Sequence, residues 1–213
     1  MTAALITMEK VFFKPWIGEN YDTGGIFKKK ILVVGESHYC ACEMCQNICG
    51  KSELSPCEDL NPDVEVKKYL SGHSNTTYKK FERSLMLAHA KEESQAIWDS
   101  IVFYNYLQEA LPNAKCVPTT RQWKNAEDPF FEIINKFIPQ LIICGGKRLY
   151  VNMPFDGWIR NEDITINNRK IRNGYYSLND NNKALVVCIN HPASWGYDCC
   201  EWRNIINYFI EYI

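Results

Sequence analysis

Four short apolar runs, separated by longer stretches of mixed polarity, constrain the fold more than any other feature of this sequence. They are rich in branched aliphatic residues and span Ile31 to Gly35, Ile101 to Tyr104, Leu141 to Gly145 and Ala184 to Ile189. Apolar runs of this length, bounded by turn residues, are typical of strands that are buried on both faces. Helical periodicity returns between them, which is the pattern of a parallel sheet covered by helices on both sides. We therefore predict a three-layer α/β/α fold around a central, mostly parallel sheet of four strands.

The helices of this fold are predicted from apolar residues at helical spacing. Such spacing is found from Tyr78 to Trp98 and again from Trp202 to Ile213. A third helix is expected to start at Asp128-Pro129, because aspartate is a good N-cap and proline is favoured at the first helical position.

Two further segments do not fit the alternation of strand and helix. Residues Ile164 to Tyr176 are polar and are expected to form a hairpin that turns near Asn167-Asn168. Residues 36–77 show little periodicity, so we expect a long loop there, with a cysteine-rich loop or insertion at about residues 40–77. The whole chain, residues 1–213, is expected to be one domain.

Composition and charge narrow the classes of protein to which the chain can belong. A formal net charge of -1 gives no strong field that would attract a polyanion, although local clusters of cations remain. No apolar stretch is long enough for a membrane helix, and the apolar start is too short for a signal peptide. We therefore expect a cytoplasmic protein that does not bind membranes. Its ten cysteines are expected to be thiols or metal ligands rather than disulfides.

Polar side chains follow three of the four predicted strands. Gly35-Glu36-Ser37-His38-Tyr39 follows the first strand, Asn105 follows the second, and Asn190 to Ser194 follows the last. Ligands of parallel α/β sheets bind outside the carboxyl ends of the strands, so these groups are expected to line one cleft. Each segment taken alone could instead be an ordinary loop whose polar side chains cap the next helix.

These three segments resemble the conserved blocks of the uracil-DNA glycosylase superfamily. In that family a first strand ends in a motif that begins with glycine and activates water. A middle strand ends in an asparagine that reads the base, and the last strand ends in a His-Pro-Ser type motif. Residues Ile31 to Tyr39, Ile101 to Tyr106 and Val186 to Ser194 match these blocks in order. The resemblance covers roughly residues 28–213. Within the superfamily, the chain is most similar to members that carry a Gly-Glu-Ser-His-Tyr motif.

The resemblance implies that the chain recognises a base in nucleic acid or in a nucleotide and hydrolyses its N-glycosidic bond. It implies base binding by His38, Tyr39, Asn105 and Ser194, with Asn105 at the edge of the base and Tyr39 as a wall of the pocket. His191 would stabilise the negative charge that develops on the departing base. Trp195 or Tyr197 would be the wedge that fills the vacated space in the base stack.

The catalytic carboxylate is where the chain departs from the best-known branch of the family. Ser37 occupies the position of the catalytic aspartate. The set of catalytic residues is therefore taken as Glu36, Ser37 and His191, with Glu36 as the nearest replacement carboxylate. Asp198 is a second carboxylate that could take this role. Neighbouring residues of an extended segment point to opposite sides, so Glu36 and Ser37 are not interchangeable.

Two other functions are compatible with the same residues. A non-catalytic module on this fold would bind a base or nucleotide without needing Glu36 or Ser37. A serine esterase of the SGNH type would use Ser37 as nucleophile, His191 as base and Asn105 as oxyanion donor. That esterase family has an aspartate three residues before its histidine, where this chain has Cys188.

A cluster of cysteines directly follows the predicted catalytic loop. Its members are Cys40, Cys42, Cys45, Cys49 and Cys57, and Cys199-Cys200 follow the histidine at the same expected edge of the sheet. Four thiolates could hold zinc or an iron-sulfur cluster, although the spacing matches no zinc-finger pattern. The same residues could equally be packed or accessible thiols. Gly145-Gly146-Lys147-Arg148 offers amides and cations to a phosphate, or is only a turn from strand to helix.

Overall fold

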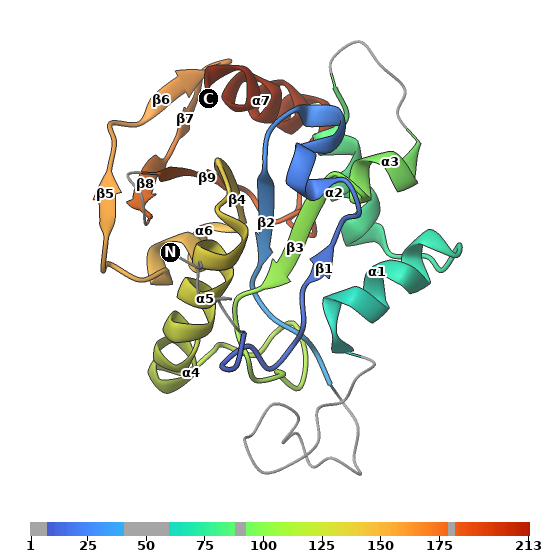
Figure 1. The fold of residues 1–213 in the computed structure, drawn as a ribbon, viewed down its shortest axis with the longest axis vertical. Coiled ribbons are helices and arrows are strands. Elements are labelled where there is room, and N and C mark those ends of the chain that lie inside the picture. Colours follow the sequence, from blue (N-terminus) through green and yellow to red (C-terminus); the bar gives the residue numbers. More distant parts are fainter. Residues whose placement is uncertain (1–7, 41–59, 88–92, 179–181) are drawn as a thin grey trace, which may run out of the picture.

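The computed structural model describes residues 8–40, 60–87, 93–178 and 182–213 of the chain. Their main feature is a seven-stranded sheet in the order β1-β3-β2-β4-β9-β8-β5 (Figure 1). The strands are β1 (Trp16–Ile17), β2 (Ile31–Gly35), β3 (Ile101–Asn105), β4 (Leu141–Gly145), β5 (Trp158–Arg160), β8 (Asn173–Ser177) and β9 (Lys183–Ile189). A separate two-stranded hairpin contains β6 (Ile164–Ile166) and β7 (Arg169–Ile171).

The predicted sheet is present but is larger than expected. The four predicted strands form its parallel centre, β3-β2-β4-β9. Three more strands extend it, with β1 antiparallel to β3, β8 antiparallel to β9, and β5 antiparallel to β8. The prediction of four strands was therefore wrong in number. The strands that it missed are short or polar, so they lack the apolar run that marks a strand buried on both faces.

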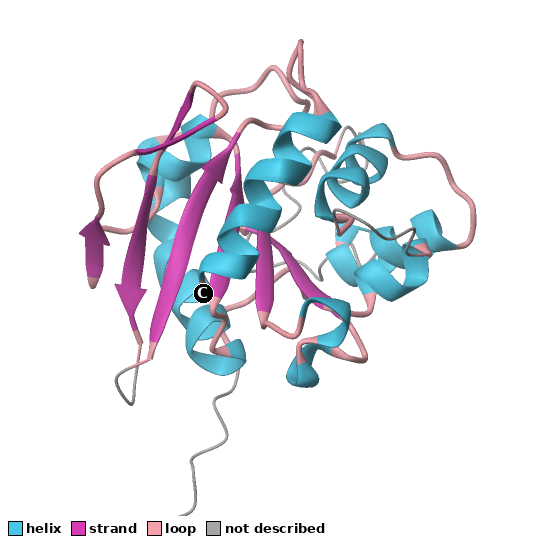
Figure 2. Cartoon of the chain, turned by 90° about the horizontal axis from the view of Figure 1, so that it is seen from above, coloured by secondary structure: helices cyan, strands magenta, loops and turns pink. Residues whose placement is uncertain are grey.

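Helices cover both faces of this sheet, as Figure 2 shows. Helices α1 (Pro62–Leu70), α2 (Thr76–Leu85), α3 (Ser94–Trp98) and α7 (Cys199–Tyr212) pack on one face, and α4 (Thr120–Asn125), α5 (Glu127–Phe137) and α6 (Lys147–Asn152) pack on the other. Two short 3-10 helices, η1 (Tyr21–Thr23) and η2 (Gly25–Phe27), precede β2. None of the helices in the described ranges has both the length and the apolar character that a membrane crossing requires.

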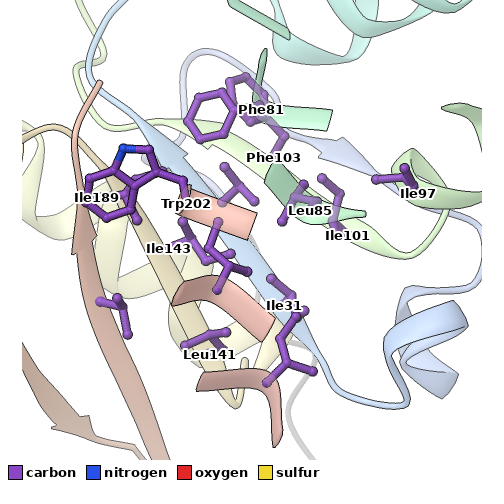
Figure 3. Close-up of a cluster of buried hydrophobic side chains, with 14 of the residues drawn as sticks. Ile31, Phe81, Leu85, Ile97, Ile101, Phe103, Leu141, Ile143, Ile189 and Trp202 are labelled. Carbon is purple, nitrogen blue, oxygen red and sulfur yellow. The ribbon is translucent and has the colours of Figure 1, made fainter. Parts of the chain in front are cut away.

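Alternation of side chains along the central strands divides the core into two clusters. Ile31, Ile143 and Ile189 point toward α2 and α7 with Phe103 and Trp202 in one cluster (Figure 3). The intervening residues of the same strands pack against α5 and α6 in the other cluster. Because both faces are buried, the central strands are continuous apolar runs, which is why they could be recognised in the sequence.

The helices differ from prediction in number as well as at their ends. The helix predicted from Tyr78 to Trp98 is two helices, α2 and α3. Helix α1 lies in the segment that was predicted to be loop. Helix α5 begins at Glu127, so Asp128 lies in its first turn and is not its N-cap. The last helix begins at Cys199, three residues earlier than predicted, because the side chain of Asp198 caps it.

The polar hairpin is confirmed in part. Strands β6 and β7 pair in antiparallel register across Asn167 and Asn168, which both have positive φ. Two consecutive residues with positive φ form the type of turn that matches the twist of a two-residue hairpin, and asparagine tolerates this conformation. From Asn173 onward, however, the chain leaves the hairpin and enters the main sheet as β8.

Replacing Asp198 with alanine is expected to lower the free energy of unfolding by about 1 kcal/mol, the usual effect of losing an N-cap. The Asp198 carboxylate accepts hydrogen bonds from the backbone N–H of Cys200 at 2.7 Å and of Glu201 at 3.1 Å. Urea unfolding of Asp198→Ala and Asp198→Asn checks this, since asparagine caps about as well as aspartate. Unchanged stability in Asp198→Ala would show that the cap contributes nothing.

Candidate functional site

A cavity of about 240 Å³ lies at the carboxyl ends of the parallel strands. We call it the strand-end cavity. The pairing of Gly35 with Asn105 and of Gly145 with Ile189 brings the ends of the four strands level with one another. Six of the residues that the sequence assigned to a site line this cavity, namely Glu36, Ser37, His38, Tyr39, Asn105 and His191. The structure thus brings residues from three separate strand ends to one cavity, although His191 is the one residue of the segment Asn190 to Ser194 that lines it.

The segment after β2 is held in place by the segment after β3. The backbone carbonyls of Gly35 and Glu36 accept hydrogen bonds from the N–H groups of Tyr106 and Leu107, both at 2.9 Å. Further along, Tyr39 forms a parallel bridge with Leu111. The two segments therefore continue side by side beyond the strands, and this pairing fixes the direction of the side chains that enter the cavity.

Gly35 and Asn105 are packed so closely that a side chain at Gly35 would displace the carboxamide of Asn105. A Cβ atom at Gly35 would lie 2.2 Å from Oδ1 of Asn105. Nδ2 of Asn105 lies 3.4 Å from Nδ1 of His38. The carboxamide of Asn105 is thus oriented by the glycine on one side and by the imidazole on the other. An amide held in this way presents one donor and one acceptor in fixed directions.

His38 is buried, and it is neutral. Burial lowers the pKa of His38 to about 3, and the backbone of Leu60 opposes this shift only in part. The ring packs against Phe13, with 4.1 Å between ring centroids. A neutral imidazole whose Nδ1 accepts from Asn105 carries its proton on Nε2. His38 therefore acts as a fixed acceptor that orients Asn105.

His191 follows β9 and is also held in one tautomer. Its Nδ1 accepts a hydrogen bond from the backbone N–H of Ala193 at 3.1 Å, so the proton of the neutral ring is on Nε2. Burial lowers the pKa of His191, although the Glu36 carboxylate nearby acts in the opposite direction. A neutral histidine with its Nε2–H donor at the cavity can stabilise negative charge that develops on a ligand.

Glu36 is a buried carboxylate with a cationic partner. Nε of Arg148 donates to Oε2 of Glu36 at 2.8 Å, and Nη2 of Arg148 donates to Oε1. The Glu36 side chain is 9% exposed and that of Arg148 is 42% exposed, so solvent reaches the arginine side of the pair. Arg148 lies in α6, directly after the Gly145-Gly146 turn. One of the two cations after that turn, Arg148, therefore binds a carboxylate of the cavity.

Ser37 has no catalytic partner in this arrangement. Its Oγ is buried and makes no hydrogen bond to any described residue. A serine nucleophile requires a hydrogen bond to its base, which the esterase hypothesis assigned to His191. The Nδ1 of His191 instead accepts from its own loop. The geometry therefore gives the esterase hypothesis no support.

The loop after His191 places its aromatic residues very differently from one another. Trp195 is fully exposed, whereas Tyr197 is 8% exposed and belongs to the core. The Tyr197 hydroxyl forms a 2.9 Å hydrogen bond with Ser84, and its ring stacks on Trp202. This placement contradicts the expectation of Tyr197 as a wedge and leaves Trp195 as the aromatic side chain on the loop surface. Ser194 is exposed and does not line the cavity.

The cysteines that were predicted to bind metal are mostly outside the described residues. Cys42, Cys45, Cys49 and Cys57 fall in that part, and Cys40 is buried in a small cluster with Phe13 and Ala110. Cys199 and Cys200 begin α7 instead of facing the cavity. Within the four described ranges, no group of three His, Cys, Asp or Glu side chains is placed to hold a metal ion. The metal prediction therefore remains a prediction.

The sequence did not identify the wall of the cavity that comes from α1 and α2. This wall contains the rings of Tyr78 and Phe81, together with the polar side chains of Glu65, Asn75 and Thr77. Phe103 of β3 completes the aromatic surface. The helical spacing of α2 marked Phe81 only as a core residue. Nothing in the spacing distinguishes a core aromatic residue from one that also borders a cavity.

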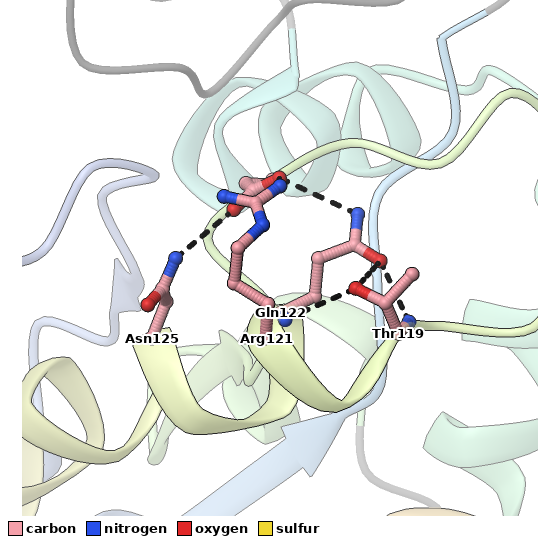
Figure 4. A network of polar contacts seen from close by, with 5 residues as sticks. Thr119, Arg121, Gln122 and Asn125 are labelled. Atoms are coloured by element: carbon pink, nitrogen blue, oxygen red, sulfur yellow. Dashed lines mark hydrogen bonds and ion pairs between the residues drawn. The ribbon is translucent and has the colours of Figure 1, made fainter.

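A polar network supports the loop that follows Asn105 and β3. Glu109, a buried residue in that loop, accepts hydrogen bonds from three side chains of α4 (Figure 4). They are Arg121 at 3.0 Å, Gln122 at 3.4 Å and Asn125 at 3.3 Å. Because the carboxylate is satisfied on several sides, the loop is tied to α4.

No protein-family model matches the chain, and no curated protein matches it. The function is therefore inferred from the residues of the strand-end cavity and their geometry. Membership of the uracil-DNA glycosylase superfamily stays a prediction from the sequence motifs.

Wild-type protein is expected to lose stability on acidification through His38. The pKa of His38 is lowered to about 3 in the folded state from 6.5, so the unfolded state binds the extra proton. The contribution of neutral His38 to the free energy of unfolding is complete above pH 6.5 and is lost as the pH falls toward 3. Between pH 7 and pH 5, the free energy of unfolding of wild type should fall by about 2 kcal/mol more than that of His38→Gln. Urea unfolding at both pH values measures the difference, and an equal loss in the two proteins would contradict a buried neutral His38.

Proposed function

We propose that the strand-end cavity binds a base of nucleic acid or of a nucleotide, and that the chain hydrolyses the N-glycosidic bond of that base. The observation that carries the proposal is the pairing of two oriented groups in one cavity. Asn105 presents a fixed amide, and His191 presents a fixed Nε2–H donor. An amide offers the donor and acceptor that complement the hydrogen-bonding edge of a base.

The aromatic wall supports the same proposal. Tyr78, Phe81 and Phe103 border the cavity together with the polar groups at the strand ends. A base has an apolar face and a polar edge, so it needs a site that is aromatic on one side and polar on another. The cavity, at about 240 Å³, is small enough to select a single ring system over a larger ligand.

In the proposed reaction, the bond between sugar and base lengthens, the sugar becomes cationic and the base becomes anionic. The His191 Nε2–H donor faces the charge on the base, which lowers the barrier because the donor is already oriented. A neutral histidine suits this role, since burial lowers the pKa of His191. The water that attacks the sugar supplies the hydroxyl group. The proton that this water loses passes to a proton-accepting side chain in the site or to solvent.

Glu36 is the carboxylate of the cavity that can orient this water. Its two oxygens are bound by Arg148, which keeps the carboxylate in place while lone pairs remain for a further hydrogen bond. The opposite charge of the guanidinium also reduces the negative charge that Glu36 can offer to a cationic sugar. Arg148 thus holds the Glu36 carboxylate in position and also reduces the negative charge that the carboxylate offers to the sugar.

Non-catalytic base binding is the second function that the geometry supports. Ser37 stands where the uracil-DNA glycosylase superfamily has its catalytic aspartate, and it makes no hydrogen bond to a described residue. Glu36 forms an ion pair with Arg148. A module of this kind needs Asn105 and the aromatic wall but no water-activating carboxylate. It predicts that Glu36→Gln leaves base binding unchanged.

Release of free base from single- and double-stranded oligonucleotides that contain uracil, hypoxanthine or damaged bases tests the proposal. Asn105→Ala and His191→Ala are expected to lower the rate of release by about 100-fold or more, because each removes an oriented group that acts in the transition state. His73→Ala is the matched control, since His73 lies outside the cavity. Its rate should equal that of wild type.

The outcomes separate the two functions. Base release that depends on Asn105 and His191 supports the glycosidase. No release, together with Asn105-dependent binding of a nucleotide in equilibrium titration, supports the binding module. Folded protein that neither releases nor binds a base would contradict both functions.

A further inference from the structure

A second cavity, of about 260 Å³, lies between α6 and the antiparallel strands β5 and β8. We call it the α6 cavity. Among the described residues, none lines both this cavity and the strand-end cavity. Arg148 and Tyr150 lie two residues apart in α6, and side chains at this spacing point in different directions. Arg148 accordingly reaches Glu36, whereas Tyr150 lines the α6 cavity.

The walls of the α6 cavity are aromatic. The ring of Trp158 meets Tyr150 in a T-shaped contact with 5.7 Å between centroids, and it packs against Tyr176 at 5.1 Å. Phe155 also lines the cavity and is 81% exposed, so it forms part of the rim. Rings on several sides favour a flat ligand, because aromatic side chains stack on or meet the edge of a planar ring.

The position of the Trp158 ring depends on a glycine in the neighbouring strand. A Cβ atom at Gly174 would lie 2.4 Å from both Cη2 and Cζ2 of Trp158. Gly174 in β8 therefore leaves the room that the indole ring occupies. Without that room, the indole would have to move from the wall of the cavity. The aromatic wall is thus set by the backbone of β8 and by the packing of Trp158.

The polar side chains that line the α6 cavity are those of two tyrosines and two arginines, and no acidic side chain lines it among the described residues. The Tyr150 hydroxyl is buried and has no hydrogen-bond partner among the described residues. Burial raises the pKa of Tyr150, so this hydroxyl keeps its proton and can donate it. Arg160 and Arg172 add two guanidinium groups. Arg160 contacts Asp163 at 3.4 Å, while Arg172 forms no ion pair in the ranges that the structure describes.

The two arginines lie at one end of the sheet. Arg160 pairs with Gly174 in register, and the backbone carbonyl of Arg172 accepts a hydrogen bond from Cys188 near the carboxyl end of β9. Both arginines therefore line the same cavity as the aromatic residues, Arg160 at the end of β5 and Arg172 directly before β8. An anionic group at an arginine and a ring between the walls would satisfy both parts of the cavity.

We propose that the α6 cavity binds a flat ring that carries a phosphate or a carboxylate group. The ring lies against Trp158 and Phe155, and the anionic group contacts Arg172. This site does not depend on the function proposed for the strand-end cavity.

Isothermal titration with four anionic and neutral probes tests the chemistry of the ligand. Adenosine monophosphate and uridine monophosphate represent ring phosphates, and benzoate represents ring carboxylates. Adenosine is the neutral comparison. We expect at least one anion to bind about 10-fold or more tightly than adenosine, because charge-assisted hydrogen bonds to arginine are lost in the neutral probe. The anion that binds identifies phosphate or carboxylate as the natural group.

Four variants, two in the α6 cavity and two controls outside it, test whether that binding is in the α6 cavity. Arg172→Gln is expected to weaken it about 10-fold or more, and Phe155→Ala is expected to weaken it too without affecting folding, since Phe155 is exposed. Lys170→Gln removes the same charge from an exposed residue two positions away that does not line the cavity, so it should bind as wild type does. Asn105→Ala changes the strand-end cavity and should also leave the affinity unchanged.

Two sets of results would overturn the proposal. One is the absence of anion binding by folded protein. If Phe155→Ala also changes the oligomeric state of that protein, this surface is a contact between copies of the chain. The other is binding that Asn105→Ala abolishes and Arg172→Gln leaves intact, because the anion would then occupy the strand-end cavity.

Discussion

The register of the four parallel strands is the constraint on which the rest of the structure depends. Leucine, isoleucine and valine residues pair level across β3, β2, β4 and β9, and this alignment ends all four strands at the same edge. A slip of one residue would turn every buried side chain toward the wrong helical layer. It would also separate Gly35 from Asn105. The apolar core and the polar cavity are therefore specified by the same pairing.

The order of the strands explains why the charged pair lies where it does. The chain leaves β2 to form β3 on one side and later returns to form β4 on the other side of β2. The connections on opposite faces diverge above β2 and β4, which opens a crevice at the carboxyl ends of these strands. Glu36 follows β2 and Arg148 follows β4, so their ion pair spans this crevice. The topology brings the two charges together, although they are far apart in the sequence.

The sequence predicted the central strands and the side of the strand-end cavity that follows them, because apolar runs and the polar residues after them are local signals. Strands β5 and β8 were missed because their pattern is polar and mixed, and their pairing depends on distant residues. The ion pair of Glu36 with Arg148 was missed for the same reason. Tyr197 was misassigned because its burial depends on Ser84 and Trp202, which no local pattern relates to it.

Helix α6 has six residues, which is less than two turns. Its Arg148 side chain holds the carboxylate of one cavity, and its Tyr150 side chain, two residues later, lines another. One short helix therefore supplies part of the wall of two cavities. A substitution that breaks α6, such as a proline in its middle, would alter both walls at once.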